Sequence, residues 1–154
     1  MITIYTDGIC EPNPGKAAWA FIVFRDGQEI HRAYGALNGK KTNNDAEYVA
    51  FGKALRWIQE NASYSQEVAL LSDSQLVLHQ VAGDWACNKE HLRRYVERCR
   101  ELLADLRSKV RLTYDWVSGD SNPADEITRI AYRQDYGINP PIRHKKAVFP
   151  NSSL

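Results

Sequence analysis

Residues 2–36, ITIYTDGICEPNPGKAAWAFIVFRDGQEIHRAYGA, decide the fold. Segments 2–6 and 18–25 are rich in aromatic and β-branched residues, which is typical of strands. The dipeptide Asp26-Gly27 favours a tight hairpin and leads into a third strand near 28–36. We therefore predict that the chain opens with an antiparallel meander of three strands.

The rest of the chain alternates helical and extended patterns. Apolar residues at helical spacing predict a helix over 43–60, and Gly52 within it indicates close packing against the sheet. The elements after it are a strand at 67–71, a short helix that stops at Gly83, a helix over 88–107, a strand over 110–117, and a helix that Asn122 and Pro123 open and Gly137 ends. Three antiparallel strands followed by βα units predict an α/β fold with a mixed five-stranded sheet and helices on its faces.

The length of 154 residues suits one domain, placed at 1–137, with residues 138–154 as a mobile C-terminal extension. Net charge is only +1, but residues 89–111 carry eight Lys and Arg against four Asp and Glu. The basic run RHKK at 143–146 either adds nonspecific affinity for a polyanion or keeps the tail solvated. Irregularly spaced cysteines and the lack of a long apolar run predict a cytoplasmic protein with no membrane partner. We expect a monomer.

Four acidic residues fall where strands end or helices begin. Asp7 closes the first strand and Asp73 directly follows the fourth, while Glu47 and Asp125 fall in the first turns of two helices. Because open α/β sheets bind ligands at the carboxyl ends of their strands, we expect these side chains to gather. Each acid also has a structural explanation, since acids favour turns and first helical turns, and Asn44 and Glu47 have capping-box spacing.

A carboxylate cluster indicates a divalent metal. Unpaired carboxylates a few ångströms apart repel one another, and a shared cation removes that repulsion. Hard oxygen ligands suit Mg²⁺, for which Mn²⁺ can substitute. Two such ions about 4 Å apart can activate a water and stabilise the leaving oxygen of a phosphodiester.

Four segments around these acids resemble the motifs of type 1 ribonuclease H. They appear in family order and cover roughly residues 1–135: YTDGIC at 5–10 with NPG at 13–15, TNN at 42–44 with AEY at 46–48, SDSQLV at 72–77, and WV at 116–117 with NPADE at 122–126. The resemblance implies a ribonuclease H-like fold and an endonuclease that hydrolyses the RNA strand of RNA/DNA hybrids, leaving 5′-phosphate and 3′-hydroxyl ends. The metal-binding and catalytic carboxylates that it implies are Asp7, Glu47, Asp73 and Asp125, which would hold two Mg²⁺ ions.

The resemblance also implies substrate-binding residues. Asn13, Asn43 and Gln75 match positions that contact the hybrid in its minor groove, where an amide can both donate to and accept from a 2′-hydroxyl. Thr42 matches a residue that helps to hold a phosphate of the DNA strand. Cys10 belongs to the first motif, with a small buried hydrophobe as its alternative. Loop and cap chemistry is the alternative for the asparagines.

The chain departs from many family members in the loop before the last catalytic aspartate. Those members carry a histidine there, whereas this loop is short and contains Asp120. Asp120 is either an auxiliary residue that orders a metal-bound water or a solvated loop acid. The short loop resembles the archaeal and reverse-transcriptase-like branch.

The sequence also contains no insertion matching the basic protrusion with which some members grip the hybrid. Lys89, Arg93 and Arg100 fall on one helical stripe with Arg107, which either tracks phosphates or forms a mixed solvated face. Trp85 either stacks on a sugar or base of the substrate or anchors the core.

Rival functions keep the fold. A hybrid-binding pseudonuclease would lack at least one of the four acids, and all are present. Another two-metal nuclease of the ribonuclease H-like superfamily would not be expected to carry Asn13, Asn43 and Gln75 together. The remaining alternatives are a ribonuclease H module of a reverse transcriptase and a purely structural domain.

Overall fold

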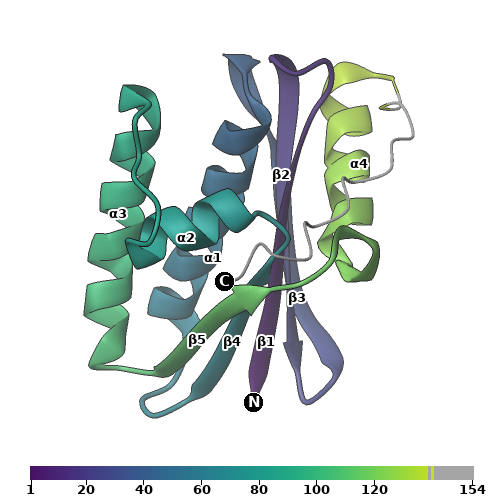
Figure 1. The fold of residues 1–154 in the computed structure, drawn as a ribbon. Coiled ribbons are helices and arrows are strands. Elements are labelled where there is room, and N and C mark those ends of the chain that lie inside the picture. Colours follow the sequence, from purple (N-terminus) through teal and green to yellow (C-terminus); the bar gives the residue numbers. More distant parts are fainter. Residues whose placement is uncertain (139, 141–154) are drawn as a thin grey trace.

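The structure, a computed structural model, describes residues 1–138 and 140. Its five-stranded sheet has the order β3-β2-β1-β4-β5 (Figure 1). The strands are β1 Ile2–Cys10, β2 Gly15–Arg25, β3 Gln28–Lys41, β4 Glu67–Ser72 and β5 Arg111–Trp116. β1, β2 and β3 pair antiparallel, whereas β4 runs parallel to both β1 and β5. The predicted mixed sheet is confirmed.

The meander forms as predicted, with longer strands. Asp26 and Gly27 take φ values of 50° and 83°, the two positive values that a type I′ hairpin turn requires. β1 does not end at Thr6, because it stays paired with β2 as far as Cys10. Asp7 therefore lies inside a strand, and its predicted place at the end of the first strand is wrong.

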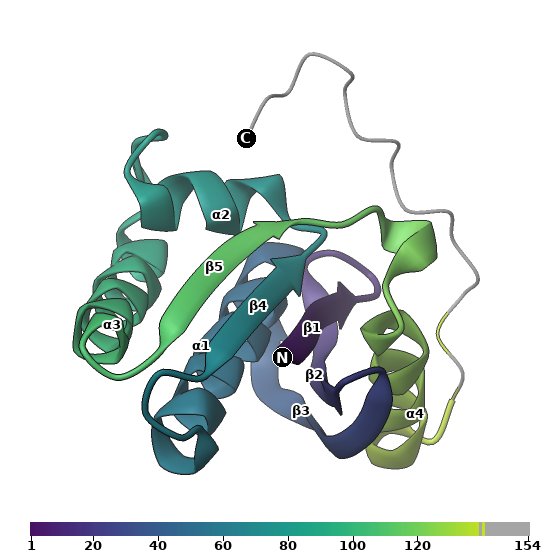
Figure 2. The same ribbon diagram turned by 90° about the horizontal axis from the view of Figure 1, so that it is seen from below.

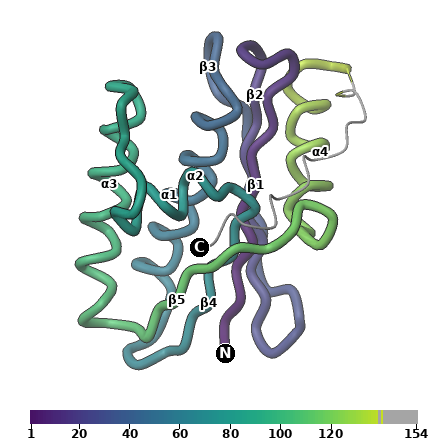
Figure 3. The backbone as a smooth tube through the Cα atoms, in the orientation of Figure 1, coloured from purple at the N-terminus to yellow at the C-terminus, as the bar shows by residue number. Residues whose placement is uncertain are grey.

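The helices form layers on the two faces of the sheet (Figure 2). α1 (Asn43–Asn61) packs on β1 and β2, and α3 (Glu90–Arg107) packs against α1. α4 (Ala124–Tyr136) covers β1, β2 and β3 from the other face. α2 (Gln75–Ala82) crosses from the end of β4 towards α3, as the backbone trace in Figure 3 shows. A short 3₁₀ turn, η1 (Gly119–Ser121), leads from β5 to α4.

The main core lies between the sheet and the α1–α3 layer. Its fully buried members include Ile2, Ile4, Phe51, Leu55 and Leu70. The predicted packing of Gly52 against the sheet is wrong, because a Cβ there would lie 3.9 Å from Sγ of Cys99 on α3. That side of α1 faces a helix.

Polar contacts fix α4 at both ends. Asn122 was predicted to cap a helix opened by Pro123, but the helix begins at Ala124. Asn122 Oδ1 accepts the N–H of Ala124, and Asn122 Nδ2 donates to the carbonyl of Thr6, 2.8 Å away. At the far end the Tyr136 hydroxyl lies 3.0 Å from carbonyl oxygens of β2 and β3. The start of α4 is thereby tied to β1 beside Asp7.

The predicted stop at Gly137 is confirmed, since it takes the left-handed conformation with φ 72°. Apart from residues 138 and 140, the predicted extension 138–154, including the basic run at 143–146, lies outside the described residues. None of the helices in the described part of the chain is long and apolar enough to cross a membrane.

Candidate active site

Asp7 and Asp73 are brought together where two parallel strands part. The β1–β4 pairing ends at Thr6 and Ser72, while β1 continues along β2. Asp7 is therefore the next residue on β1 and Asp73 the next after β4. Asp7 is fully buried and Asp73 is partly exposed.

Glu47 extends from α1 towards Asp7 and Asp73. It takes no part in the N-terminal cap of the helix, which other residues form. The Thr42 side chain accepts the N–H of Asp45, and the Asp45 carboxylate accepts the N–H and hydroxyl of Thr42 in return. This is a capping box. The predicted alternative, a box between Asn44 and Glu47, is therefore wrong. Glu47 is 5% exposed and belongs to the carboxylate group rather than to the cap.

Gly8 lets α1 approach β1 closely enough for Glu47 to meet Asp7. A Cβ atom at Gly8 would lie 2.4 Å from the carbonyl carbon of Ala46 and 2.5 Å from the amide nitrogen of Glu47. Both are backbone atoms, which cannot swing aside as a side chain can. Only glycine allows the helix to sit at this distance from the strand.

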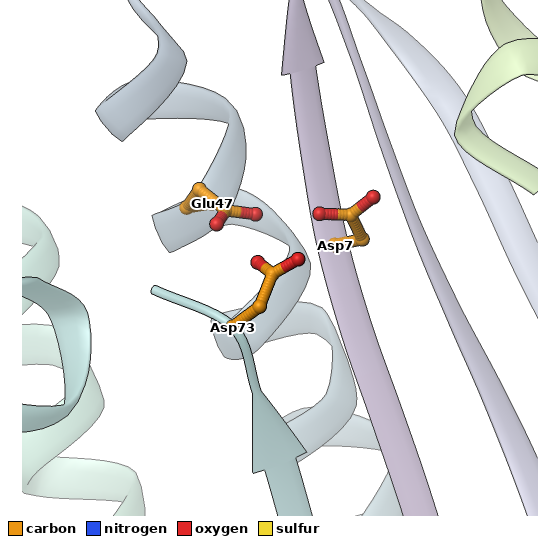
Figure 4. Close-up of side chains that lie close together, drawn as sticks. All are labelled: Asp7, Glu47 and Asp73. Atoms are coloured by element: carbon orange, nitrogen blue, oxygen red, sulfur yellow. The ribbon is translucent and has the colours of Figure 1, made fainter. Parts of the chain in front are cut away.

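One carboxylate oxygen from each of Asp7, Glu47 and Asp73 lies within 4.8 Å of the others (Figure 4). The three side chains come from β1, α1 and the end of β4, and they point towards one another. Three hard oxygen donors at this spacing, two of them buried, fit a divalent cation such as Mg²⁺ or Mn²⁺.

Asp125 is not part of this group of three among the described residues. It lies in the first turn of α4, on the opposite face of the sheet from α1. Its Oδ2 lies 3.4 Å from Nε of Arg129, one helical turn later. The structure thus gathers three of the four predicted carboxylates, and it pairs the fourth, Asp125, with the guanidinium group of Arg129.

Asn13 and Asn43 are neighbours, as a shared substrate contact would require. Oδ1 of Asn13 accepts the backbone N–H of Asn43, 3.0 Å away, which leaves the Asn13 amide N–H groups pointing elsewhere. Oδ1 of Asn43 is buried and makes no hydrogen bond within the described residues. Thr42, in contrast, donates both its N–H and its hydroxyl to Asp45, so the cap already uses its donors.

Gln75 is the first residue of α2, two positions after Asp73, and is partly exposed. α2 is tied to α1 through the Tyr48 hydroxyl, which donates to Oε1 of Gln80 at 2.6 Å. Burial raises the pKa of the Tyr48 phenol, which keeps the hydroxyl protonated as this hydrogen bond requires. The contact fixes Gln75 and Asp73 relative to Glu47, the neighbour of Tyr48.

Cys10 is fully buried, with Sγ 3.3 Å from the carbonyl oxygen of Pro12 and 3.2 Å from that of Lys41. These contacts join the β1–β2 loop to the end of β3. They favour the alternative interpretation of Cys10 as a small buried residue that shapes the loop.

The stripe on α3 is used partly within the protein. Arg100 donates to the carbonyls of Gln80 (2.8 Å) and Val81 (3.3 Å) at the end of α2. Arg93 donates to the carbonyl of Cys87, and Lys89 occupies the N-cap position of α3. Two of the three basic residues predicted as auxiliary, Arg93 and Arg100, therefore bind backbone carbonyls where α2 leads into α3.

Trp85 and Asp120 are both exposed. Trp85 is 40% exposed and stacks on the ring of His79, which differs from the predicted core anchor. Asp120 lies in η1 and lines a pocket of about 570 Å³ with Tyr5 and Phe24. It is not in the group that could hold a metal among the described residues.

Sequence patterns left Arg129, His79 and the role of Gly8 unassigned. Only Arg129 had a usable signal, since Asp125 and Arg129 have the i, i+4 spacing of a helical ion pair. The other two depend on contacts between segments that are distant in the chain.

Comparison with known proteins identifies relatives of this chain. Residues 1–130 match the family model described as RNase H. Ribonuclease H of Chlorobium luteolum is 32% identical over 147 residues, which cover 86% of this chain and 96% of that protein. Ribonuclease HI of Halobacterium salinarum is 39% identical over 100 residues, which cover 64% of this chain and 49% of that protein.

Solved structures give the same result. The crystal structure of RNase H1 from Halobacterium salinarum superposes with a TM-score of 0.77 at 32% identity, covering 86% of this chain and 98% of that one. LC11-RNase H1 in complex with an RNA/DNA hybrid gives 0.78 at 26% identity, covering 88% and 99%. The chain spans only about half the length of some curated relatives, 49% of the Halobacterium salinarum protein and 57% of Bacillus subtilis YpeP.

Proposed function

The chain belongs to the type 1 ribonuclease H family, and we propose that it is an endonuclease that hydrolyses the RNA strand of RNA/DNA hybrids. The observation that carries the proposal is the convergence of Asp7, Glu47 and Asp73 within 4.8 Å. The hybrid bound by its structural neighbour LC11-RNase H1 supports the same substrate. Membership of the archaeal and reverse-transcriptase-like branch, and a cytoplasmic monomer, stay predictions.

Asp7, Glu47 and Asp73 would hold Mg²⁺, and we propose Asp125 as a fourth ligand. Divalent ions bound there would supply an activated water and stabilise the leaving oxygen, giving 5′-phosphate and 3′-hydroxyl ends. The protein's own contribution is to hold the carboxylates rigidly: β1 and α1 are fixed at Gly8, and α2 is fixed by Tyr48.

Recognition of the hybrid is assigned to the amides beside this cluster. Asn13, Asn43 and Gln75 would contact 2′-hydroxyls, which distinguish RNA from DNA. The available amide groups of Asn13 and Asn43 support this role. Thr42 would contribute mainly by fixing the start of α1, because Asp45 already takes both of its donors.

The decisive experiment is cleavage of an end-labelled RNA/DNA hybrid with Mg²⁺, with Mn²⁺ and with EDTA, beside RNA/RNA and DNA/DNA duplexes. We expect metal-dependent cutting confined to the RNA of the hybrid. Tight hybrid binding without cutting would favour the pseudonuclease. Cutting of DNA duplexes would favour another two-metal nuclease of the superfamily.

A further inference from the structure

The buried imidazole of His79 forms a flat support for Trp85. The two rings stack with centroids 4.2 Å apart and planes inclined by 14°. His79 is 4% exposed, whereas Trp85 is 40% exposed. One face of the indole is therefore covered by the histidine, and its exposed surface belongs to the other face and the edges.

The His79 side chain holds Trp85 through the ring stack and not through a hydrogen bond from its ring nitrogens. Neither ring nitrogen of His79 makes a hydrogen bond with any residue that the structure describes. Its Nδ1 atom lies 3.4 Å from Oδ2 of Asp84, the residue before Trp85. An aromatic ring buried with so few polar contacts acts mainly by its shape.

The chain around Trp85 is fixed at every step. The backbone N–H groups of Asp84 and Trp85 both donate to the carbonyl of His79, at 2.9 and 3.2 Å. The next two residues offer their carbonyls: that of Ala86 accepts from Gln80, and that of Cys87 accepts from Arg93. Trp85 is thus an exposed aromatic ring on a rigid segment between α2 and α3.

We propose that His79 is a positioning residue that holds the Trp85 indole as a stacking surface for the nucleic-acid duplex. The proposal rests on the hybrid-cleaving function proposed above. Packing of a sugar of the duplex on an aromatic ring is sequence-tolerant, because every nucleotide of a strand offers the same sugar, and this suits a nuclease that acts on any hybrid sequence. An indole already held flat loses less conformational freedom on binding than one that must be ordered by the ligand.

The position of this surface predicts which kinetic constant it affects. α2 has eight residues and a length of about 12 Å, with Asp73 before its first turn and His79 in its last. Trp85 therefore contacts the duplex away from the scissile phosphate. Loss of the stack is expected to weaken binding and raise KM, while kcat stays within about twofold of the wild type.

The test compares substitutions of His79 that differ in shape. His79→Leu keeps an apolar side chain but removes the flat ring, whereas His79→Phe keeps the ring. We expect His79→Leu to weaken hybrid binding by about 5- to 150-fold, which is the range for losing one stacked contact, and His79→Phe to restore it. Trp85→Leu should give the same loss without altering a buried residue, and His79→Leu with Trp85→Leu should lose little more.

Binding of a labelled hybrid in EDTA, kcat and KM in Mg²⁺, and near-ultraviolet circular dichroism would be recorded for each variant. Unchanged binding by His79→Leu or Trp85→Leu in an active wild-type background would overturn the positioning role alone. Equal losses of hybrid binding for His79→Phe and His79→Leu would also overturn it, because a loss that does not depend on the flat ring comes from a change in side-chain volume or in the fold. A wild type that neither binds nor cuts the hybrid would instead remove the proposed function and this inference together.

Discussion

Arg129 Nε lies 3.4 Å from Oδ2 of Asp125, one helical turn apart on α4, and both side chains are about a quarter exposed. This ion pair holds the positive charge of Arg129 against Asp125, the predicted metal ligand that lies outside the group of Asp7, Glu47 and Asp73. A cation that recruits Asp125 must therefore compete with Arg129.

Arg129→Gln should bind Mg²⁺ and Mn²⁺ more tightly than the wild type. Removing one positive charge near the surface is expected to lower the half-saturating metal concentration by about three- to tenfold, corresponding to about 1 kcal/mol. Isothermal titration calorimetry with Mn²⁺ would measure this without relying on activity. Arg133→Gln, in the last turn of α4, is the matched control, and weaker metal binding by Arg129→Gln would contradict the competition.

Gly8→Ala should damage the site far more than its one added methyl group suggests. The new Cβ would meet backbone atoms of Ala46 and Glu47 at 2.4 and 2.5 Å, so α1 must move away from β1. We expect a loss of about 1–3 kcal/mol in the free energy of unfolding and a more than tenfold drop in cleavage. Denaturant unfolding and initial rates would measure the two effects.

The matched control for Gly8→Ala is Gly52→Ala in α1, the helix that packs on Gly8. Its Cβ would make an ordinary contact with Cys99 at 3.9 Å, and alanine is favoured over glycine inside helices by about 1 kcal/mol. Gly52→Ala should therefore be neutral or stabilising. A Gly8→Ala variant of wild-type stability and activity would show that the approach of β1 and α1 is not required.

Asp7→Asn should abolish cleavage while hybrid binding survives. The substitution keeps the size of a fully buried side chain but removes one negative charge from the carboxylate group. The amides assigned to binding, on Asn13, Asn43 and Gln75, are untouched. Cleavage and gel-shift assays of the same preparation separate the two properties, and a cleaving Asp7→Asn variant would refute the assigned metal site.

Arg100→Ala should lower stability more than it alters phosphate binding. Its guanidinium donates to two carbonyls at the end of α2, and hydrogen bonds from charged groups contribute about 1.5–3 kcal/mol each at most. We expect a loss of about 1–3 kcal/mol in the free energy of unfolding, with an unchanged salt dependence of hybrid binding. Arg98→Ala, whose exposed side chain pairs only with Glu101 among the described residues, should change stability by less than about 0.5 kcal/mol.

The salt dependence decides between the two interpretations of the stripe on α3. Removing a residue that neutralises a phosphate reduces the slope of the logarithm of the binding constant against the logarithm of the salt concentration by about one. A reduced slope for Arg100→Ala at unchanged stability would assign it to the substrate. Within the part of the chain that the structure describes, Arg107 makes no such hydrogen bond to a carbonyl. It is therefore a better candidate than Arg100 for a phosphate ligand.

Local patterns predicted the elements well and their limits less well. The Asp26-Gly27 turn, the helix α3 and the stop at Gly137 are confirmed because each depends on residues close in sequence. The end of β1 was placed too early because its continuation depends on pairing with β2. The start of α4 shifted because the Asn122 side chain also binds Thr6 on β1.

The sequence by itself determined the fold class, the family motifs and the set of acids, because turn chemistry, hydrophobic period and residue identity are local properties. Only the tertiary structure decided which of these acids converge, namely Asp7, Glu47 and Asp73, that Asp125 pairs with Arg129, and that Trp85 lies on His79. These relationships depend on strand register and on how closely helices approach the sheet. Both are set by packing between distant segments, which no local pattern encodes.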